Sequence, residues 1–400
     1  SACRLCTMRK LPSVLARTLT SGTSGSPVLP DMSEVRSRLR DIVGASTNWR
    51  YSVVGQERKA LHTSLAKRQE DLSPRRMKDS YLEVILPLGS QPEIREKYLN
   101  VHNSVRFGRI LEDLDSLGVL ICYTHTKQEM QPRSPLSIVT ALVDKINLCK
   151  KIIYPDCDIK FTGNVSWVGR TSMEVKMHML QVSSRDFSPS YYSSLPVWVP
   201  MFLLERNSEK EAGRAGEGAL NKLKRIDFST ASLLKMAPTA EERNIVHDIF
   251  LNTLDTRQEG EGTVSFRSRK LPPNSVWMED AKLKGLQICH PQERNIFNRI
   301  FGGFLMRKAF ELGWATACSY GCSRPFIVSV DDIMFQRPVE VGSLLLLSGQ
   351  VCYTEKNYIQ VRVHSEVYDP DTREHQTTNI FHFTFISENE VPRVVPKTYG

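Results

Sequence analysis

Hydrophobic and polar positions follow the same succession of patterns twice along this chain. Hydrophobic residues first recur every three or four positions, as in an amphipathic helix, and then alternate with polar residues, as in strands. Residues 137–178 and 324–366 carry the two alternating segments, and Gly163 and Gly349 occupy matching places in them (349 − 163 = 186). A Gly-containing helical segment precedes each copy, at about 106–123 and 300–320. The repetition predicts a duplicated α+β unit, with an interface between two related halves.

The periodicity predicts individual elements in both halves. A lead-in helix is expected at 31–45, and Thr239 and Glu242 have the spacing of a capping box that opens another helix. Strands are expected at 77–88, 137–147, 158–167 and 171–182, and then at 264–270, 275–280, 326–335, 342–354, 357–367 and 376–387. We therefore expect one domain at 77–204, a linker with a helix at 205–262, and a second domain at 263–390.

One element differs between the two halves. The strand at 376–387 alternates regularly, but its counterpart near 190–201 contains Pro196 and Pro200. Proline cannot donate to a sheet ladder, and central strands tolerate it badly. We expect the segment at 187–204 to be poorly ordered or only partly paired, and the first domain to be the less stable one.

Composition narrows the class of protein. With 400 residues, 40% of them hydrophobic, the chain can bury a large core in two domains. Nine scattered cysteines favour a reducing compartment, and the lone pair Cys3 and Cys6 is not expected to bind metal. No apolar run is long enough to span a bilayer. The net charge of +9 fits a polyanionic small molecule, and no nucleic-acid motif accompanies it.

The first 30 residues are basic, rich in Ser and Thr, and free of acidic residues. This composition predicts a mitochondrial transit peptide at 1–30. The alternative is a basic tail without structure of its own.

The second helical segment opens with a candidate binding site. Asn295 precedes Gly302 and Gly303, which stand at the expected start of the helix. Paired glycines allow close approach to a ligand, and a helix N-terminus presents unpaired N–H donors that could hold a carbonyl oxygen as it gains negative charge. Close helix–strand packing alone would also explain the glycines.

The first helical segment supplies a candidate general base. Asp115 lies at the edge of the apolar stripe, whereas Glu112 and Asp113 are expected to point away from it. A structural carboxylate with a nearby donor is the alternative. At the matching place the second helix carries Phe310, followed by Glu311 on the solvated side. No nucleophile motif such as GxSxG, no Walker lysine and no GxGxxG fingerprint is present.

Longer strings carry a family resemblance. The segments RFGRILEDLDSLGVLICY, HPQERNIFNRIFGGFLMRKA and VDDIMFQ resemble the double-hotdog acyl-CoA thioesterases over roughly residues 31–400. The resemblance implies two hotdog folds, each an antiparallel sheet wrapped around a long central helix. It also implies hydrolysis of fatty acyl-CoA to fatty acid and CoA in mitochondria, without a cofactor or metal, by a homo-oligomer of double-hotdog units.

The same resemblance assigns roles to residues. Asp115 would activate water, Asn295 would hold the water or the thioester, and amides near Gly302 and Gly303 would take the oxyanion. In the reciprocal site Phe310 replaces the acid, and Asn100 or Asn103 precedes a lone Gly108. CoA phosphate contacts are expected from Arg170, Arg337 and Lys356.

Two other classes of protein stay open. A non-catalytic acyl-CoA-binding or degenerate thioesterase-like protein would have the same fold, and the altered strand at 187–204 favours it. A hotdog dehydratase is disfavoured because no catalytic histidine with suitably spaced helix acid is evident.

Overall fold

The computed structural model describes most of both predicted domains. The described residues are 29–43, 74–127, 133–134, 136, 138–144, 146–148, 152–169, 172–182, 193–204 (backbone), 237–254, 269–295, 299–331 and 333–398. Most of the predicted transit peptide, the Cys3 and Cys6 pair, Arg170 and most of the strand predicted at 264–270 lie outside them.

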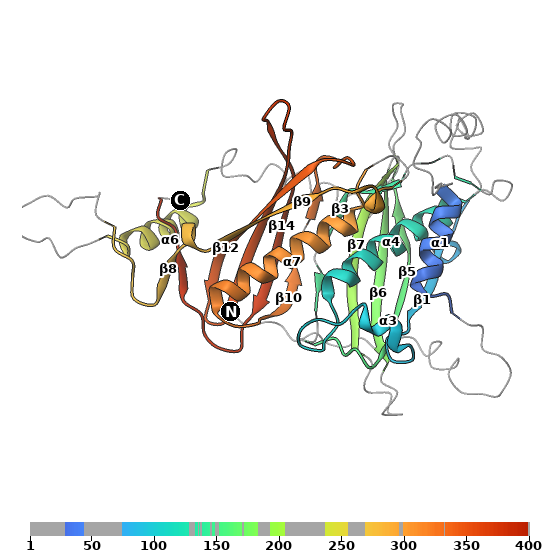
Figure 1. Cartoon of the computed structure of the whole chain (residues 1–400), viewed down its shortest axis with the longest axis horizontal. Coiled ribbons are helices and arrows are strands. Elements are labelled where there is room, and N and C mark those ends of the chain that lie inside the picture. Colours follow the sequence, from blue (N-terminus) through green and yellow to red (C-terminus); the bar gives the residue numbers. More distant parts are fainter. Residues whose placement is uncertain are drawn as a thin grey trace, which may run out of the picture.

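The first half consists of a lead-in helix, a long central helix and a set of strands (Figure 1). Its elements are α1 (Met32–Val43), η2 (Met77–Ser80), β1 (Leu82–Leu86), α3 (Pro92–Glu96), α4 (Phe107–Thr126), β2 (Ile138–Thr140), β3 (Leu142–Val143), β4 (Ile146–Asn147), β5 (Asp158–Val168), β6 (Ser172–Val182) and β7 (Ser193–Leu204). The helix α6 (Ala240–Leu251) follows in the predicted linker and begins with the predicted capping box, in which the Glu242 amide donates to Thr239 Oγ1.

The second half repeats this succession. Its elements are β8 (Ser275–Trp277), η4 (Met278–Asp280), β9 (Lys282–Ile288), η5 (Pro291–Glu293), α7 (Gly302–Gly321), β10 (Phe326–Val330), β11 (Ile333–Phe335), β12 (Leu344–Glu355), β13 (Tyr358–Tyr368), β14 (His375–Ile386) and β15 (Arg393–Val395). The predicted alternation in β14 is confirmed, because Phe381, Phe383 and Phe385 are all buried on one face.

Among the described residues, one 13-stranded sheet passes through both halves. Ten of its strands follow the order β1-β5-β6-β7-β4-β10-β14-β13-β12-β9, and β2, β3 and β11 pair beside this path. The halves join where Val143 pairs with Ile333 and Ile146 pairs with Val330. Val143 is equivalent to Val330, and Ile146 to Ile333, because both differences in number are 187 (330 − 143 and 333 − 146). Exchanging the two halves therefore turns one pair into the other. The join is therefore a pseudo-twofold axis, and the fold is a tandem hotdog in the α+β class.

The central helices α4 and α7 lie next to each other on one face of the sheet (Figure 1). Each is 20 residues long, and their first residues are Phe107 and Gly302 (302 − 107 = 195). Both helices bury an apolar stripe against the sheet, as their periodicity predicts. None of the helices that the structure describes is long and apolar enough to cross a membrane.

The proline-containing segment forms strand β7, which is paired along one edge and only in part along the other. Its backbone pairs with β6 from Ser193 to Leu203, and part of its other edge pairs with β2 and β4. The register passes from Val175–Val199 to Glu174–Met201, so Pro200 is the extra residue of a β-bulge. A bulge is a position where a strand tolerates proline, because the extra residue leaves the ladder. The strand forms despite its prolines.

Several strand boundaries also differ from the predicted ones. The expected strands 137–147 and 326–335 are each broken into shorter strands where they pair across the join between the two halves. Of the expected strand 77–88, only Leu82–Leu86 forms a strand. Strand β9 at the sheet edge was not predicted from its sequence, although it alternates in burial.

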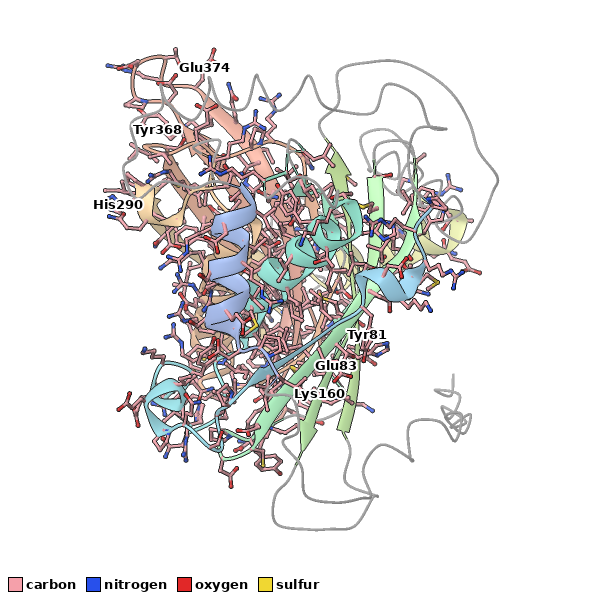
Figure 2. All side chains as sticks on the ribbon, turned by 90° about the vertical axis from the view of Figure 1, so that its right-hand side faces the viewer. Tyr81, Glu83, Lys160, His290, Tyr368 and Glu374 are labelled. Carbon is pink, nitrogen blue, oxygen red and sulfur yellow. The ribbon has the colours of Figure 1, made fainter. Side chains whose placement is uncertain are left out.

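The opposite edge strand of the sheet is β1. Its Glu83 forms an ion pair with Lys160 on β5, and the Tyr81 hydroxyl donates to the same carboxylate (Figure 2).

Candidate functional site

Asp115 is held between the two halves. It lies midway along α4 and is only 3% exposed. Its Oδ2 accepts a hydrogen bond of 2.8 Å from the amide of Gly303 on α7, and its Oδ1 accepts one of 2.5 Å from the hydroxyl of Thr140 on β2. Burial raises the pKa of Asp115, and the two hydrogen bonds oppose that rise. The structure thus brings together Asp115 and Gly303, which lie far apart in the sequence.

Gly303 is required for the close approach of the two helices. A Cβ atom on Gly303 would lie 2.9 Å from Glu112 Cα and 3.0 Å from Asp115 Cβ. A Cβ on Gly302 would meet the ring of Phe335 at 3.2 Å instead. Gly303 therefore serves close packing of helix on helix, in place of the helix–strand packing considered from the sequence, and it is also a donor to Asp115.

The two glycine amides have different roles. The amide of Gly303 donates to Asp115, so it is not available to an oxyanion in this arrangement, contrary to expectation. Gly302 is the first residue of α7, and the first amide of a helix has no acceptor within the helix. Of the two predicted oxyanion contacts, the one from Gly302 is compatible with this arrangement and stays a prediction.

Asn295 shapes the loop that leads into α7. Its Oδ1 accepts from the amide of Arg299 at 3.1 Å, and its own amide donates to the Arg299 carbonyl oxygen at 2.6 Å. The structure shows the Asn295 side chain in a loop-closing role, and its contact with water or the thioester stays a prediction.

Thr140 is a site residue that the sequence analysis missed. Its hydroxyl is the second donor to Asp115, from a strand 25 residues further along the chain. The repeat held a signal for it, because offset 187 places Ile327 opposite Thr140 (327 − 140 = 187). Thr140 is polar and its counterpart Ile327 is apolar, just as Asp115 is polar and its counterpart Phe310 is apolar. The two differences lie at the same place in the repeat.

The reciprocal site has the same packing without the polar groups. With the helix offset of 195, Gly108 matches Gly303 and Phe310 matches Asp115. A Cβ on Gly108 would lie 3.1 Å from Arg307 Cγ and 3.4 Å from the Phe310 ring, as in the first site. Phe310 therefore stands where the acid would be, which confirms its predicted position.

Asn100, and not Asn103, is the counterpart of Asn295. Asn100 Oδ1 accepts from the amide of Ser104, four residues on, at 3.1 Å, which repeats the contact of Asn295 with Arg299. Asn103 has a positive φ of 53° in the same turn. The two halves therefore carry one matching asparagine each.

The predicted orientation of two helix acids was wrong. Glu112 faces α7, where its Oε1 accepts from Arg307 Nε at 2.7 Å. Asp113 is fully buried toward α1, where it accepts hydrogen bonds from Arg36 and, at 2.6 Å, from the Tyr98 hydroxyl. Burial raises the pKa of Asp113 to about 6, and the Arg36 guanidinium opposes the rise. Both acids hold the helix α4 to neighbouring segments.

The residues expected to contact CoA do not form one group. Arg337 follows Phe335, which packs against Gly302, and its guanidinium donates to Gln376. Lys356 lies in the exposed turn between β12 and β13, at the opposite end of β14. Ten residues of β14 separate Gln376, the partner of Arg337, from Ile386, which pairs beside Lys356, and the strand rise places these ends roughly 33 Å apart. Arg337 is thus near the start of α7, whereas Lys356 is remote from it.

Known proteins are similar to this chain in sequence. The family profile described as Thioesterase superfamily matches residues 297–374. The chain is 63% identical over 412 residues to acyl-coenzyme A thioesterase 9, mitochondrial, of Bos taurus, with 100% of this chain and 93% of that protein covered. It is 61% identical over 414 residues to the Homo sapiens protein of the same name, with the same coverage.

A solved acyl-CoA hydrolase from Staphylococcus aureus, in complex with butyryl coenzyme A, coenzyme A and coenzyme A disulfide, is 25% identical. That match covers 31% of this chain and 79% of the other, with a TM-score of 0.30. The family is shown by the full-length relatives, and the chain belongs to the acyl-coenzyme A thioesterases.

Proposed function

We propose that this chain hydrolyses fatty acyl-CoA thioesters at a single site, in which Asp115 activates the attacking water. The observation that carries the proposal is the buried carboxylate of Asp115, held by Gly303 from one side and Thr140 from the other. Its pKa is raised by burial, which strengthens it as a base while two donors keep it oriented.

The reaction follows from these positions. Asp115 takes a proton from water, and the oxygen of that water bonds to the thioester carbonyl carbon. The developing oxyanion faces the helix start, where the amide of Gly302 and the positive end of the helix dipole stabilise negative charge. The carbon–sulfur bond then breaks, the CoA thiolate takes the proton from Asp115, and the fatty acid leaves. Asn295 positions the substrate through the loop that it closes.

Of the two matching positions that the structure describes, one carries the acid. Phe310 replaces Asp115 and Ile327 replaces Thr140, so the matching positions of the reciprocal site hold neither the aspartate nor its hydroxyl partner. The non-catalytic alternative would be favoured by loss of the acid at both positions, and Asp115 is in place.

We also propose that the protein acts in mitochondria and that its double-hotdog units associate into a homo-oligomer. The acid-free first 30 residues and the mitochondrial relatives support a mitochondrial setting. Edge strand β9 exposes Leu286 and Ile288 by 53% and 52%, and this apolar edge supports association of double-hotdog units. Arg337 is the candidate for a CoA phosphate contact nearest to the start of α7.

The test compares two acids of the central helices. We expect Asp115→Asn to lower turnover of acyl-CoA by roughly two or more orders of magnitude, the scale of losing a general base. Glu311→Gln is the control, because Glu311 is a partly exposed acid beside the reciprocal site that pairs with Arg106. Thiol release is measured on purified protein with no metal added. Equal losses in the two variants would overturn the assignment, and release at the buffer rate while acyl-CoA still binds would favour the binding protein.

A further inference from the structure

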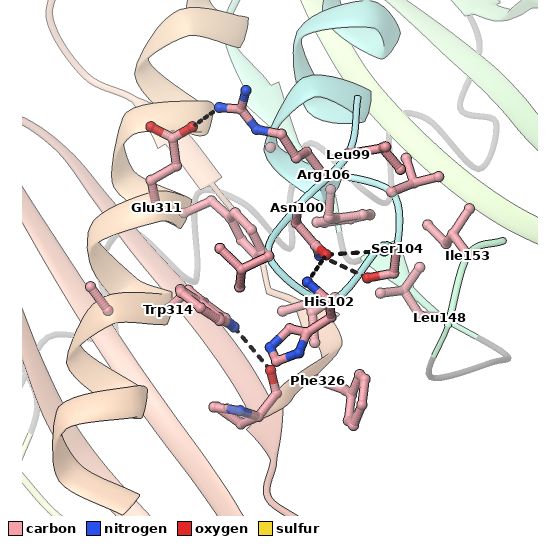
Figure 3. A pocket seen from close by; sticks show the side chains of 18 residues that line it. Leu99, Asn100, His102, Ser104, Arg106, Leu148, Ile153, Glu311, Trp314 and Phe326 are labelled. Carbon is pink, nitrogen blue, oxygen red and sulfur yellow. Dashed lines mark hydrogen bonds and ion pairs between the residues drawn. The ribbon is translucent and has the colours of Figure 1, made fainter. Parts of the chain in front are cut away.

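The reciprocal site contains a cavity of about 600 Å³. Its walls come from both halves: the turn before α4 with the first residues of that helix, and the middle of α7 with the start of β10 (Figure 3). Phe107, Gly108 and Phe310 line it, and these are the residues that match Gly302, Gly303 and Asp115. The cavity therefore occupies the place of a second active site.

The lining of this cavity is apolar where the first site is polar. Phe310 stands in place of the acid and packs edge-on against Phe107, with ring centroids 5.4 Å apart. Ile327 stands in place of the threonine, and Trp314 and Phe326 complete the wall. A volume of this size with mostly hydrophobic and aromatic walls is typical of a small-molecule site.

Most polar groups at the cavity are already engaged, and the His102 imidazole, which also lines it, packs against Trp314 with ring centroids 6.3 Å apart. Asn100 Nδ2 donates to Ser104 Oγ at 2.7 Å, and its Oδ1 accepts from two amides of the same turn. The Trp314 indole donates to the Pro325 carbonyl oxygen at 3.0 Å. At the rim, Arg106 is paired with Glu311 at 2.8 Å. With these groups engaged, the remaining surface favours an apolar occupant.

We infer that this cavity binds a fatty acyl chain without hydrolysing it. The inference rests on the proposed function, because the pseudo-twofold axis makes the cavity the equivalent of the site where the acyl substrate reacts. The second copy of the site has a cavity that can hold an acyl chain, but it has Phe310 in place of the base and Ile327 in place of the hydroxyl partner. Each protein chain would then bind two acyl chains and hydrolyse only one. The same chemistry is offered by the substrate and by the fatty acid product.

The experiment counts binding sites in a protein that cannot turn over its ligand. Asp115→Asn is titrated with S-hexadecyl-CoA, a thioether that cannot be hydrolysed, and separately with palmitate, by isothermal calorimetry. We expect two equivalents of at least one probe per chain. Two equivalents of the thioether and one of palmitate would identify acyl-CoA as the ligand of the cavity, and the reverse would identify the fatty acid. One equivalent of each probe would overturn the inference.

A cavity-filling variant assigns the second equivalent. Ala315 on α7 lines the cavity, so Ala315→Trp combined with Asp115→Asn should bind one equivalent. Ser319→Trp, an exposed position of the same helix, is the matched control and should bind two. Ala315→Leu, a smaller change, should weaken the second equivalent at least tenfold if the tryptophan variant does not fold. Retention of two equivalents of equal affinity in both filling variants would also overturn the inference.

Activity is measured separately with Asp115 intact. Ala315→Trp should keep its turnover number within about twofold of the parent, because the proposed catalytic groups lie at the other site. Full hydrolysis by the Asp115→Asn protein would instead refute the proposed function, and the number of bound thioether molecules would still report on the cavity.

Discussion

Glu112 and Arg307 are equivalent positions of the two halves, and they form an ion pair with each other. Arg307 Nε lies 2.7 Å from Glu112 Oε1, both side chains are 13% exposed, and the helix offset relates them (307 − 112 = 195). Two identical subunits would place like residues around such an axis. Duplication within one chain allowed opposite charges there, and the pair holds α4 against α7 at the place where Gly303 reaches Asp115.

The first prediction concerns the two members of this pair. Glu112→Ala should destabilise the protein by roughly 3 kcal/mol, the lower part of the range for breaking a largely buried pair. Arg307→Ala should cost less, because Glu112 keeps a close partner in Arg109 at 2.9 Å, whereas Glu112→Ala leaves Arg307 only the more distant Glu293 at 4.0 Å as a carboxylate partner among the described residues. Denaturant unfolding of both variants gives the free energies. A larger loss for Arg307→Ala would contradict the assignment.

The second prediction concerns the hydroxyl donor to the candidate base. Thr140→Val removes a hydrogen bond that lowers the pKa of Asp115, so that pKa should rise further. Because the base works when it is ionised, turnover falls as the pH drops through this pKa, and the acid limb of the rate profile should move to higher pH. Thr140→Ser keeps the hydroxyl and should leave the limb in place. If the acid limb of the rate profile stays at the same pH in Thr140→Val, the Thr140 hydroxyl does not influence the base.

The third prediction uses the two matched glycines. Gly303→Ala places a Cβ 2.9 Å from the backbone of Glu112, so the helices must separate and Asp115 is displaced. A shift of this kind at a catalytic group costs about a hundredfold in turnover. Gly108→Ala meets the Arg307 side chain at 3.1 Å, at the site without the acid, and should retain most activity. Steady-state kinetics of both variants, with circular dichroism to confirm folding, decide the matter. Similar losses would mean that both sites turn over substrate.

The fourth prediction concerns stability and pH. The folded protein binds the Asp113 proton more tightly than the unfolded chain does, because burial raises the pKa from 3.8 to about 6. Stability from this group is therefore present at low pH and is lost as the pH rises from about 4 to 6. Asp113→Asn should flatten the change in melting temperature over that window. A parent and a variant with the same pH dependence would show that Asp113 does not titrate there.

The fifth prediction concerns β7. Its second edge pairs at four described positions, through β2 and β4, whereas β14 pairs at six on the equivalent edge. Proline also removes two amides from β7. We expect hydrogen exchange of amides at 193–201 to be faster than at 378–386, and the first domain to unfold first. Equal protection in the two strands would show that the prolines carry no cost.

The local patterns determined much of this protein without any structure. The duplication, both central helices and the long strands follow from periodicities of 3.6 and 2, which depend only on neighbouring residues. Comparison of the two copies also identified Asp115, the Gly302–Gly303 pair and Phe310, because a repeat exposes the positions at which its halves differ.

Tertiary structure decided what each of these residues touches. Thr140 and Gly303 meet Asp115 from 25 and 188 positions away, and no periodicity in the sequence reports such a contact. Burial of Asp113 likewise depends on α1 docking against α4, and the breaks at 137–147 and 326–335 arise where strands pair across the join between the halves. A bulge that absorbs Pro200 exists only once β6 fixes the register. Orientation and pairing are set by the packing of distant segments, which amino-acid pattern alone does not specify.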